Sequence, residues 1–290
     1  MAVTAEFPAT VSHMKSLNLY SLAYHGAGVL IVVFVGAYVA RSAFYVETAS
    51  PCSKRYPAGM QFALQTNDGA LMSPPELQAR VSLPERGVLE NTKIVSVSRG
   101  PSRVALEVKL ANVTSMESDS SGSHNGFDFR WRPPGLNTAQ AACLTYNLWL
   151  PRRFEFGRGG VLPGIYGSTI GSNPAFAARV AWNDKSEISV DVERSGAKTR
   201  NINDASHSKK ALTPGRWAAI EQEVVLNSSE NSDGAVRLWV DGQLLTEDTR
   251  IVMRTDDIIN ISGVLANIGY AGSSKKTDTI RLSPFELSWR

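Results

Sequence analysis

Cysteine and histidine are scarce in this sequence. Two cysteines and four histidines are dispersed over 290 residues, whereas a protein metal site usually has ligands at close, regular spacing. We therefore expect no bound metal, and no cofactor motif is present. Cys52 and Cys143 allow two interpretations. They form either a disulfide that closes a long loop, as in an exported protein, or two buried free thiols.

A concentrated basic charge is also missing. The formal net charge is only +3, and Lys and Arg are scattered rather than gathered into a stripe with interleaved aromatic residues. A nucleic-acid partner is therefore not expected. The slight excess of positive charge is a weak argument for an acidic partner.

One long apolar run stands out in a chain that otherwise has none. It extends from Leu19 to Ala40, and its core AGVLIVVFVGAYVA begins at Ala27. About 20 apolar residues suffice to cross a bilayer. We expect a tail over residues 1–18, an uncleaved transmembrane anchor over 19–44 and a folded domain over 45–290. A cleavable signal peptide is the alternative, but its basic start and cleavage site are poorly represented here.

The flanking charges bear on the orientation of that anchor. Lys15 precedes the apolar run, while Arg41, Lys54 and Arg55 follow it, and this count alone would keep the domain in the cytoplasm. We nevertheless expect the domain to be periplasmic or extracellular, because of the family resemblance described below. The membrane, and other membrane or envelope proteins, are then expected partners.

Beyond residue 45 no long stretch keeps a helical period. Short runs of alternating polar and apolar residues predict strands instead. In EISVDVE, for example, Ile188, Val190 and Val192 share one face while the acidic residues share the other. Asp241-Gly242 predicts a hairpin turn between two runs. The other predicted strands lie at 104–113, 144–150, 178–182, 218–226, 235–245 and 279–289. We predict an all-β fold, a two-sheet antiparallel sandwich or jelly roll.

Several segments carry a family resemblance. The segment LTYNLWLPRRFEFGRGGVLPGIYG (Leu144–Gly167) resembles the strand and Gly-Gly loop of polysaccharide lyase family 14 and its alginate-lyase-like relatives. FAARVAW (Phe176–Trp182) and the Leu212–Leu245 run resemble later motifs of the family in the same order. The resemblance implies a concanavalin-like β-jelly roll with an open sheet that holds an acidic, uronate-containing polysaccharide.

The resemblance carries only part of the family's cleft residues to this chain. Arg179 matches the family's arginine, but Ala177 replaces its serine. Arg158 and Val161 stand in place of the loop lysines. The family's Tyr-x-Tyr pair aligns with Asp191 and Glu193, so both phenols are missing. The resemblance therefore implies binding with weakened or lost lyase activity, and an active lyase is the alternative.

β-Elimination from a uronate polymer needs a cation for the C6 carboxylate, a base for the C5 proton and an acid for the leaving oxygen. Arg179 is the candidate clamp for the carboxylate. Arg158 can assist, but its guanidinium stays protonated and is no base. Tyr166, read as part of a loop, is the candidate phenolic acid or base, and a packed aromatic residue is the alternative. A basic groove extended by further arginines is one interpretation, and solvated loop charges are the other, for Arg130, Arg132, Arg152 and Arg153.

Asp191 and Glu193 permit a different chemistry. Residues i and i+2 project from the same face of a strand about 7 Å apart, which suits two carboxylates on either side of a glycosidic bond. A glycoside hydrolase is therefore a second alternative function. Either acid can instead form an ion pair with Arg179 from a neighbouring strand.

Overall fold

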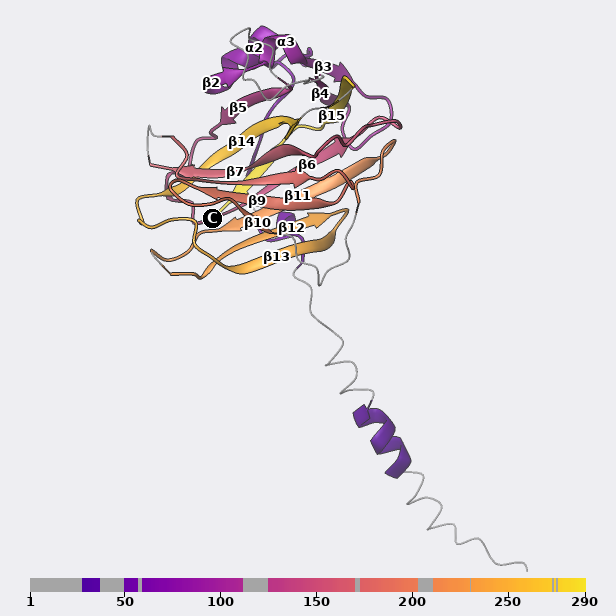
Figure 1. Cartoon of the computed structure of the whole chain (residues 1–290), viewed down its shortest axis with the longest axis vertical. Coiled ribbons are helices and arrows are strands. Elements are labelled where there is room, and N and C mark those ends of the chain that lie inside the picture. Colours follow the sequence, from indigo (N-terminus) through magenta and orange to yellow (C-terminus); the bar gives the residue numbers. More distant parts are fainter. Residues whose placement is uncertain are drawn as a thin grey trace, which may run out of the picture. The chain divides into compact units, whose positions relative to one another are not determined.

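The computed structural model describes residues 28–36, 50–56, 59–111, 125–169, 173–202, 211–229, 231–272, 274 and 276–290. Residues Ala49–Arg290 form one compact unit, and Met1–Thr48 form another. In the described part of the larger unit, two antiparallel sheets pack against each other (Figure 1).

The larger sheet has nine strands among the described residues. Seven of them follow the order β13-β12-β11-β6-β15-β4-β3, and β16 pairs with both β6 and β1. Their bounds are β1 Gly59–Gln61, β3 Thr92–Ser96, β4 Val104–Leu110, β6 Ala141–Trp149, β11 Trp217–Val225, β12 Gly234–Val240, β13 Gln243–Ile251, β15 Asp278–Leu282 and β16 Glu286–Trp289.

The smaller sheet has seven described strands in the order β10-β9-β8-β7-β14-β5-β2. Their bounds are β2 Ser82–Arg86, β5 Phe127–Trp131, β7 Gly160–Ser168, β8 Phe176–Trp182, β9 Ile188–Arg194, β10 Arg200–Ile202 and β14 Asn260–Tyr270. Short helical segments complete the description: η1 Cys52–Lys54, α2 Pro74–Arg80, α3 Val88–Asn91 and η2 Leu136–Thr138. In Figure 1, α2 and α3 lie near β2 and β3.

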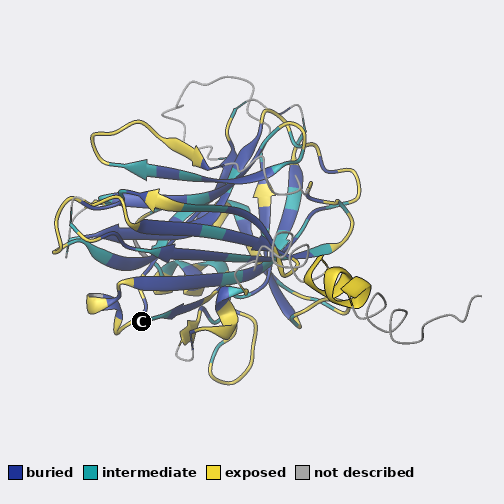
Figure 2. Cartoon of the chain, turned by 90° about the horizontal axis from the view of Figure 1, so that it is seen from below, coloured by how far each residue is buried: buried dark blue, intermediate teal, exposed yellow. Residues whose placement is uncertain are grey.

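The hydrophobic core fills the space between the two sheets. Alternate residues of most strands enter it, such as Leu144 and Leu148 of β6 and Val180 of β8. The colouring of Figure 2 follows this division, with buried strands and exposed turns. Strand periodicity therefore confirms the predicted two-sheet antiparallel sandwich.

Two local predictions need correction. The segment 279–289 is two strands, because Pro284 between them has no N–H for the ladder and the side chain of Ser283 instead accepts the N–H of Asn147 at 2.8 Å. The segment around Tyr166 is a strand rather than a loop, since β7 pairs with β8 and β14. The helices α2 and α3 were not predicted from the sequence. The Asp241-Gly242 turn is confirmed, with φ of 52° and 76° at its two residues.

Most of the predicted anchor, residues 19–44, lies outside the described residues. Its described portion, 28–36, is helical, and its large apolar side chains are exposed, from Val35 at 56% to Phe34 at 76%. Within the described ranges, no helix combines the length and the apolar content required for a bilayer crossing.

The two cysteines form a disulfide. Cys52 and Cys143 lie 5.7 Å apart at their Cα atoms and 91 residues apart in sequence. Cys143 projects from β6 on the side of the larger sheet that faces away from the core, where Trp239 and Leu244 pack beside it. The bond therefore fastens the first described residues of the domain to this surface.

A buried carboxylate reinforces the same attachment. Glu223 of β11 is 1% exposed and accepts hydrogen bonds from Tyr56 Oη at 2.7 Å, Arg55 Nη2 at 2.9 Å and Arg237 Nη1 at 2.8 Å. A buried charge is tolerated when it is paired and hydrogen-bonded in this way. Burial and the hydrogen bond to Glu223 raise the pKa of Tyr56 to about 12.

Candidate functional site

Arg179 lies on the outer face, by which we mean the side of the smaller sheet that is turned away from the larger one. Its neighbours Ala178 and Val180 enter the core, so the guanidinium must project to the other side. The predicted alternation along β8 is therefore confirmed. The side chain is 17% exposed, and its neighbours on the same face along β8 are Ala177 and Ala181.

A bulge in the adjacent strand shapes the backbone beside Arg179. Pairing between β7 and β8 shifts between Leu162 and Gly164, at the proline, which has no N–H to donate. The carbonyl of Pro163 accepts instead from Tyr146 Oη of the opposite sheet at 3.2 Å. A Cβ at Gly164 would lie 1.9 Å from the carbonyl oxygen of Ala178, so only glycine fits there. The bulge at Pro163 and the missing side chain at Gly164 thus determine how closely β8 lies beside β7.

The two acidic candidates of β9 share the outer face with Arg179, but they have different partners. Asp191 is directly opposite Arg179 in the strand register, and Glu193 is opposite Ala177. The ion pair of Arg179 is nevertheless diagonal, from Nη2 to Glu193 Oε1. Asp191 accepts a hydrogen bond from Asn201 Nδ2 of β10 at 2.6 Å. The expected intramolecular pair with Arg179 is thus present, and Glu193 is the partner.

Tyr166 lies on the same face, in the middle of the sheet. It pairs with Ala177 of β8 on one side and Gly263 of β14 on the other. Its side chain is 1% exposed, and the guanidinium carbon of Arg130 lies 5.9 Å from its ring centroid. Within the described residues its hydroxyl makes no hydrogen bond. Arg130 is therefore part of the site, covering the phenol as a cation–π partner.

The structure does not bring Arg158 to Arg179. Arg158 precedes β7 in an exposed turn, where its side chain lies near Gly272. The adjoining Gly160 pairs with Trp182, at the end of β8 rather than at Arg179. Val161, which aligns with a family lysine, pairs with Ala181 and carries no charge.

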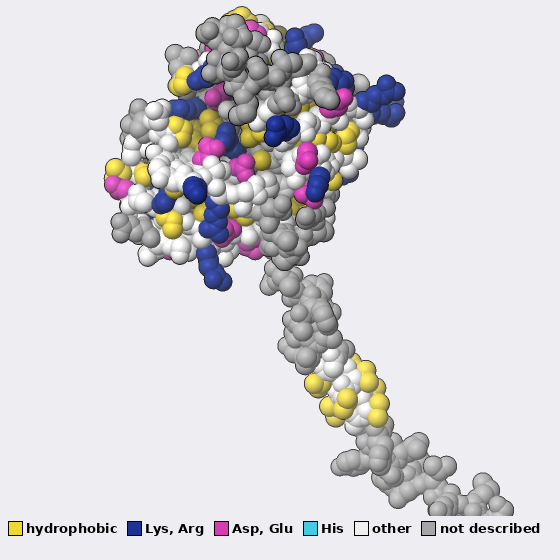
Figure 3. Space-filling model, viewed as in Figure 1, with side chains coloured by type: hydrophobic (Ala, Val, Ile, Leu, Met, Phe, Trp, Pro, Cys, Tyr) yellow, Lys and Arg dark blue, Asp and Glu magenta, His cyan; other side chains and the backbone are white. Residues whose placement is uncertain are grey.

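Asp128 is a member of this polar face that the sequence analysis missed. It lies on β5 between two core phenylalanines, opposite Asn267 of β14 and Arg86 of β2. Burial raises its pKa, while the charges of Arg86, Arg130 and Arg179 and a hydrogen bond to Asn267 act in the other direction. The period of two in FDFRW is the signal that would have revealed it. Figure 3 shows acidic and basic side chains interspersed on the face that it draws.

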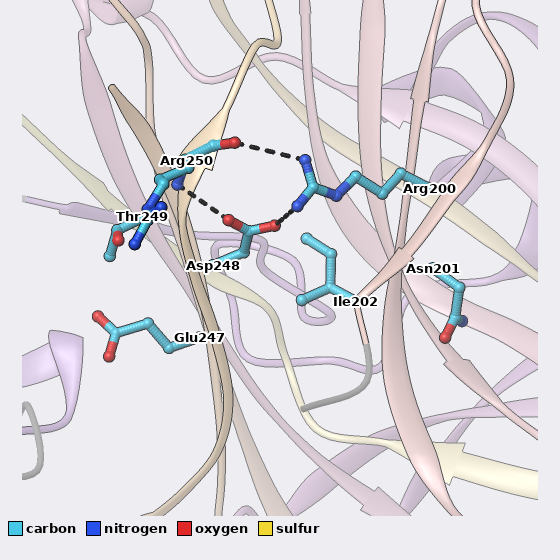
Figure 4. Close-up of a pocket in the computed structure, with 7 residues that line it drawn as sticks. All are labelled: Arg200, Asn201, Ile202, Glu247, Asp248, Thr249 and Arg250. Atoms are coloured by element: carbon cyan, nitrogen blue, oxygen red, sulfur yellow. Dashed lines mark hydrogen bonds and ion pairs between the residues drawn. The ribbon is translucent and has the colours of Figure 1, made fainter. Parts of the chain in front are cut away.

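A separate pocket of about 510 Å³ lies between β10 and β13, at the edge of the sandwich. Figure 4 shows Arg200 crossing it to form an ion pair with Asp248 and to donate to the carbonyl of Arg250 at 3.3 Å. None of the five predicted site residues lines this pocket. The contacts of Arg200 with Asp248 and Arg250 join β10, at the edge of the smaller sheet, to β13, at the edge of the larger sheet.

Among the described residues, the one cluster with metal-ligand atoms close together is Cys52, Cys143 and Glu221. Both sulfurs are in the disulfide and provide no thiolate for a metal.

The fold is a jelly-roll sandwich with polar side chains on the outer face of the smaller sheet. Comparison with family models shows the family to which the chain belongs. A family model for polysaccharide lyase 14 matches residues 99–281. Because the match covers more than half of the 290 residues, the chain belongs to this family. No curated protein matches the sequence significantly.

Solved structures of alginate lyases share the fold. The marine PL-14 alginate lyase from Aplysia kurodai has a TM-score of 0.57 and 21% identity, over 71% of this chain and 90% of that one. The alginate lyase vAL-1 from Chlorella virus has a TM-score of 0.62 and 17% identity, over 81% and 100%. Alginate lyase Aly36B, solved as a mutant with an alginate trisaccharide, has a TM-score of 0.56 and 15% identity, over 81% and 99%.

Proposed function

We propose that the domain binds acidic, uronate-containing polysaccharide on the outer face of the smaller sheet, with Arg179 as the anchor for a sugar carboxylate. The observation that carries this proposal is the position of Arg179 on the outer face of the smaller sheet, partly exposed at 17% and with alanines on either side of it along β8. Planar guanidinium groups suit carboxylates. Membership of the lyase family and the alginate bound to Aly36B support this class of ligand.

β-Elimination on the same face is the second candidate, and family membership favours it over the loss of activity implied by the missing lysine and tyrosines. In this reaction a base removes the C5 proton, the electron pair forms the C4–C5 double bond, and the O4 leaving group takes up a proton. Arg179 would neutralise the C6 carboxylate and stabilise the charge that develops there. Tyr166 pairs with Ala177, two residues before Arg179 on β8, and is the candidate phenol for proton transfer. It would act once Arg130 moves off its ring.

The hydrolase alternative is less well supported by the geometry. Glu193 is held by Arg179, and Asp191 is held by Asn201. Hydrolysis through these two carboxylates would require both contacts to open. New reducing ends without an unsaturated product would indicate this chemistry.

The test measures binding and cleavage separately. The full-length chain is titrated with a panel of uronate polymers, and the absorbance of the unsaturated product is then followed. Arg179→Ala should weaken binding about tenfold or more, at a cost of about 1–3 kcal/mol, with little change in melting temperature. Arg250→Ala, which removes an exposed guanidinium at the sandwich edge, is the control. Equal affinity of wild type and Arg179→Ala for every polymer would reject the proposed site.

We further propose that residues 19–44 anchor the chain in a membrane and that the domain lies outside the cytoplasm. The unbroken apolar run supports the anchor. The disulfide supports an oxidising compartment, because cytosolic proteins rarely keep such bonds. A reporter that fluoresces only in the cytoplasm, fused after Arg290, should stay dark. A bright fusion would contradict this location and agree with the count of flanking positive charges.

A further inference from the structure

The contact between Arg179 and Glu193 leaves the arginine incompletely used. Nη2 of Arg179 contacts Oε1 of Glu193, but the neighbouring Nε is buried and has no hydrogen-bond partner. A carboxylate that binds a guanidinium through both oxygens satisfies two such donors at once. Glu193 satisfies only one. A buried donor without a partner is unfavourable. A carboxylate that contacted both nitrogens would therefore bind Arg179 better than Glu193 does.

The two partners also differ in their access to solvent. The side chain of Glu193 is 44% exposed, whereas that of Arg179 is 17% exposed. The acid is therefore the member of the pair that is more accessible to an approaching ligand. An ion pair with one exposed member contributes little stability. Opening this ion pair therefore requires little free energy.

We propose that Glu193 is a specificity-determining residue that occupies Arg179 in the unliganded protein and is displaced by the carboxylate of a bound uronate. This inference rests on the proposed function and adds to it a role for the acid that replaces a family tyrosine. A uronate exchanges one carboxylate for another on Arg179. A neutral sugar offers only hydroxyl groups, which do not replace the charge that Arg179 would lose.

The surroundings of Glu193 leave room for this movement. Glu193 also lines a cavity of about 300 Å³ that is bounded by Pro174, Ala177 and Thr199, among others. Turning toward this cavity takes the carboxylate off Arg179 without any change in the backbone pairing of β9. Asp191 and Asn201 keep their own hydrogen bond on the other side, so the exchange is confined to one side chain.

The experiment compares the wild-type full-length chain with Glu193→Gln by calorimetric titration. The ligands are an alginate oligosaccharide and a neutral cello-oligosaccharide of the same length. Glu193→Gln should bind the alginate oligosaccharide about three- to tenfold more tightly, because the competing charge and its repulsion of the ligand are both removed. Binding of the neutral oligosaccharide should not tighten to the same extent. Glu193→Ala should behave in the same way as Glu193→Gln, which separates loss of charge from any effect of the new amide.

Asp184→Asn is the matched control. Asp184 is exposed in the turn that joins β8 and β9, so its replacement removes one negative charge from the same hairpin without touching Arg179. It should leave both affinities unchanged. An equal gain in Asp184→Asn would show that general charge, not displacement, explains the effect, and would overturn the proposal.

The remaining outcomes separate this inference from the proposed function. If wild type binds the uronate and Glu193→Gln binds it equally or more weakly, the role of Glu193 is rejected and the binding function stands. If neither protein binds any uronate oligomer, both are rejected. If only Glu193→Gln binds, Glu193 blocks Arg179 and is not displaced by the ligand, which overturns the displacement and keeps Arg179 as the binding group.

Discussion

Gln222 of the larger sheet donates a hydrogen bond from Nε2 to the carbonyl oxygen of Ala178 in the smaller sheet, at 3.0 Å. The bond crosses the core and ends on the residue that precedes Arg179. Gln222 is completely buried, and its Oε1 has no partner. Gln222 thus links the two sheets directly behind the candidate site.

We predict that Gln222→Ala lowers the free energy of unfolding by about 1–3 kcal/mol, because the Ala178 carbonyl loses its donor in the core. Urea denaturation followed by tryptophan fluorescence measures the change. Gln61→Ala, at an exposed position of β1, is the control and should change the value by less than about 0.5 kcal/mol. Equal stability of the two variants would show that the cross-sheet bond contributes nothing.

Gly164→Ala should destabilise the domain by about 1–3 kcal/mol or more, or prevent folding. The new Cβ would lie 1.9 Å from the Ala178 oxygen, and backbone there cannot move without breaking the β7–β8 pairing. Gly272→Ala is the comparison, since its nearest neighbour would be the flexible Arg158 side chain at 3.4 Å. The soluble yield and the melting temperature of both variants measure the loss of stability. A normally folded Gly164→Ala would show that the bulge does not require glycine.

Removal of the disulfide should reduce stability by about 2–5 kcal/mol, because the bond closes a loop of 91 residues and restricts the unfolded chain. The double variant Cys52→Ser, Cys143→Ser and the reduced wild type should show the same loss in chemical denaturation. A difference between them would point to an effect of the serines. An unchanged denaturation midpoint in both would show that Glu223 and its partners hold the segment without the bond.

Tyr56 should make the fold sensitive to alkali. Its pKa is raised from 10.0 to about 12 in the folded protein, so the unfolded chain loses this proton first as the pH rises. Its contribution to stability is therefore fully present below pH 10 and declines between pH 10 and about 12. Tyr56→Phe should cost stability at pH 9 through the lost bond to Glu223, and the cost should be smaller at pH 11. Urea midpoints of both proteins at the two pH values test this. A constant difference would contradict the raised pKa.

The sequence alone determined the architecture because strand alternation is local. Ile188, Val190 and Val192 show their common buried face without any knowledge of the partner strands, and Asp241-Gly242 specifies its turn by backbone preference alone. The same local rule placed Arg179 on the outer face of the smaller sheet. The order of motifs was sufficient to indicate the lyase family, which the family match confirms.

Only the tertiary structure decided which side chains meet. The choice between Asp191 and Glu193 as the partner of Arg179 depends on a diagonal contact and on Asn201 of another strand. The joining of Cys52 to Cys143 depends on where the first residues of the domain cross the larger sheet. Tyr166 looked like a loop residue because proline and glycine surround it, but pairing on both sides makes that segment a central strand. Contacts between residues distant in sequence depend on how the strands pair and how the sheets pack. They cannot be predicted from local periodicity, because it reflects only neighbouring residues of one strand.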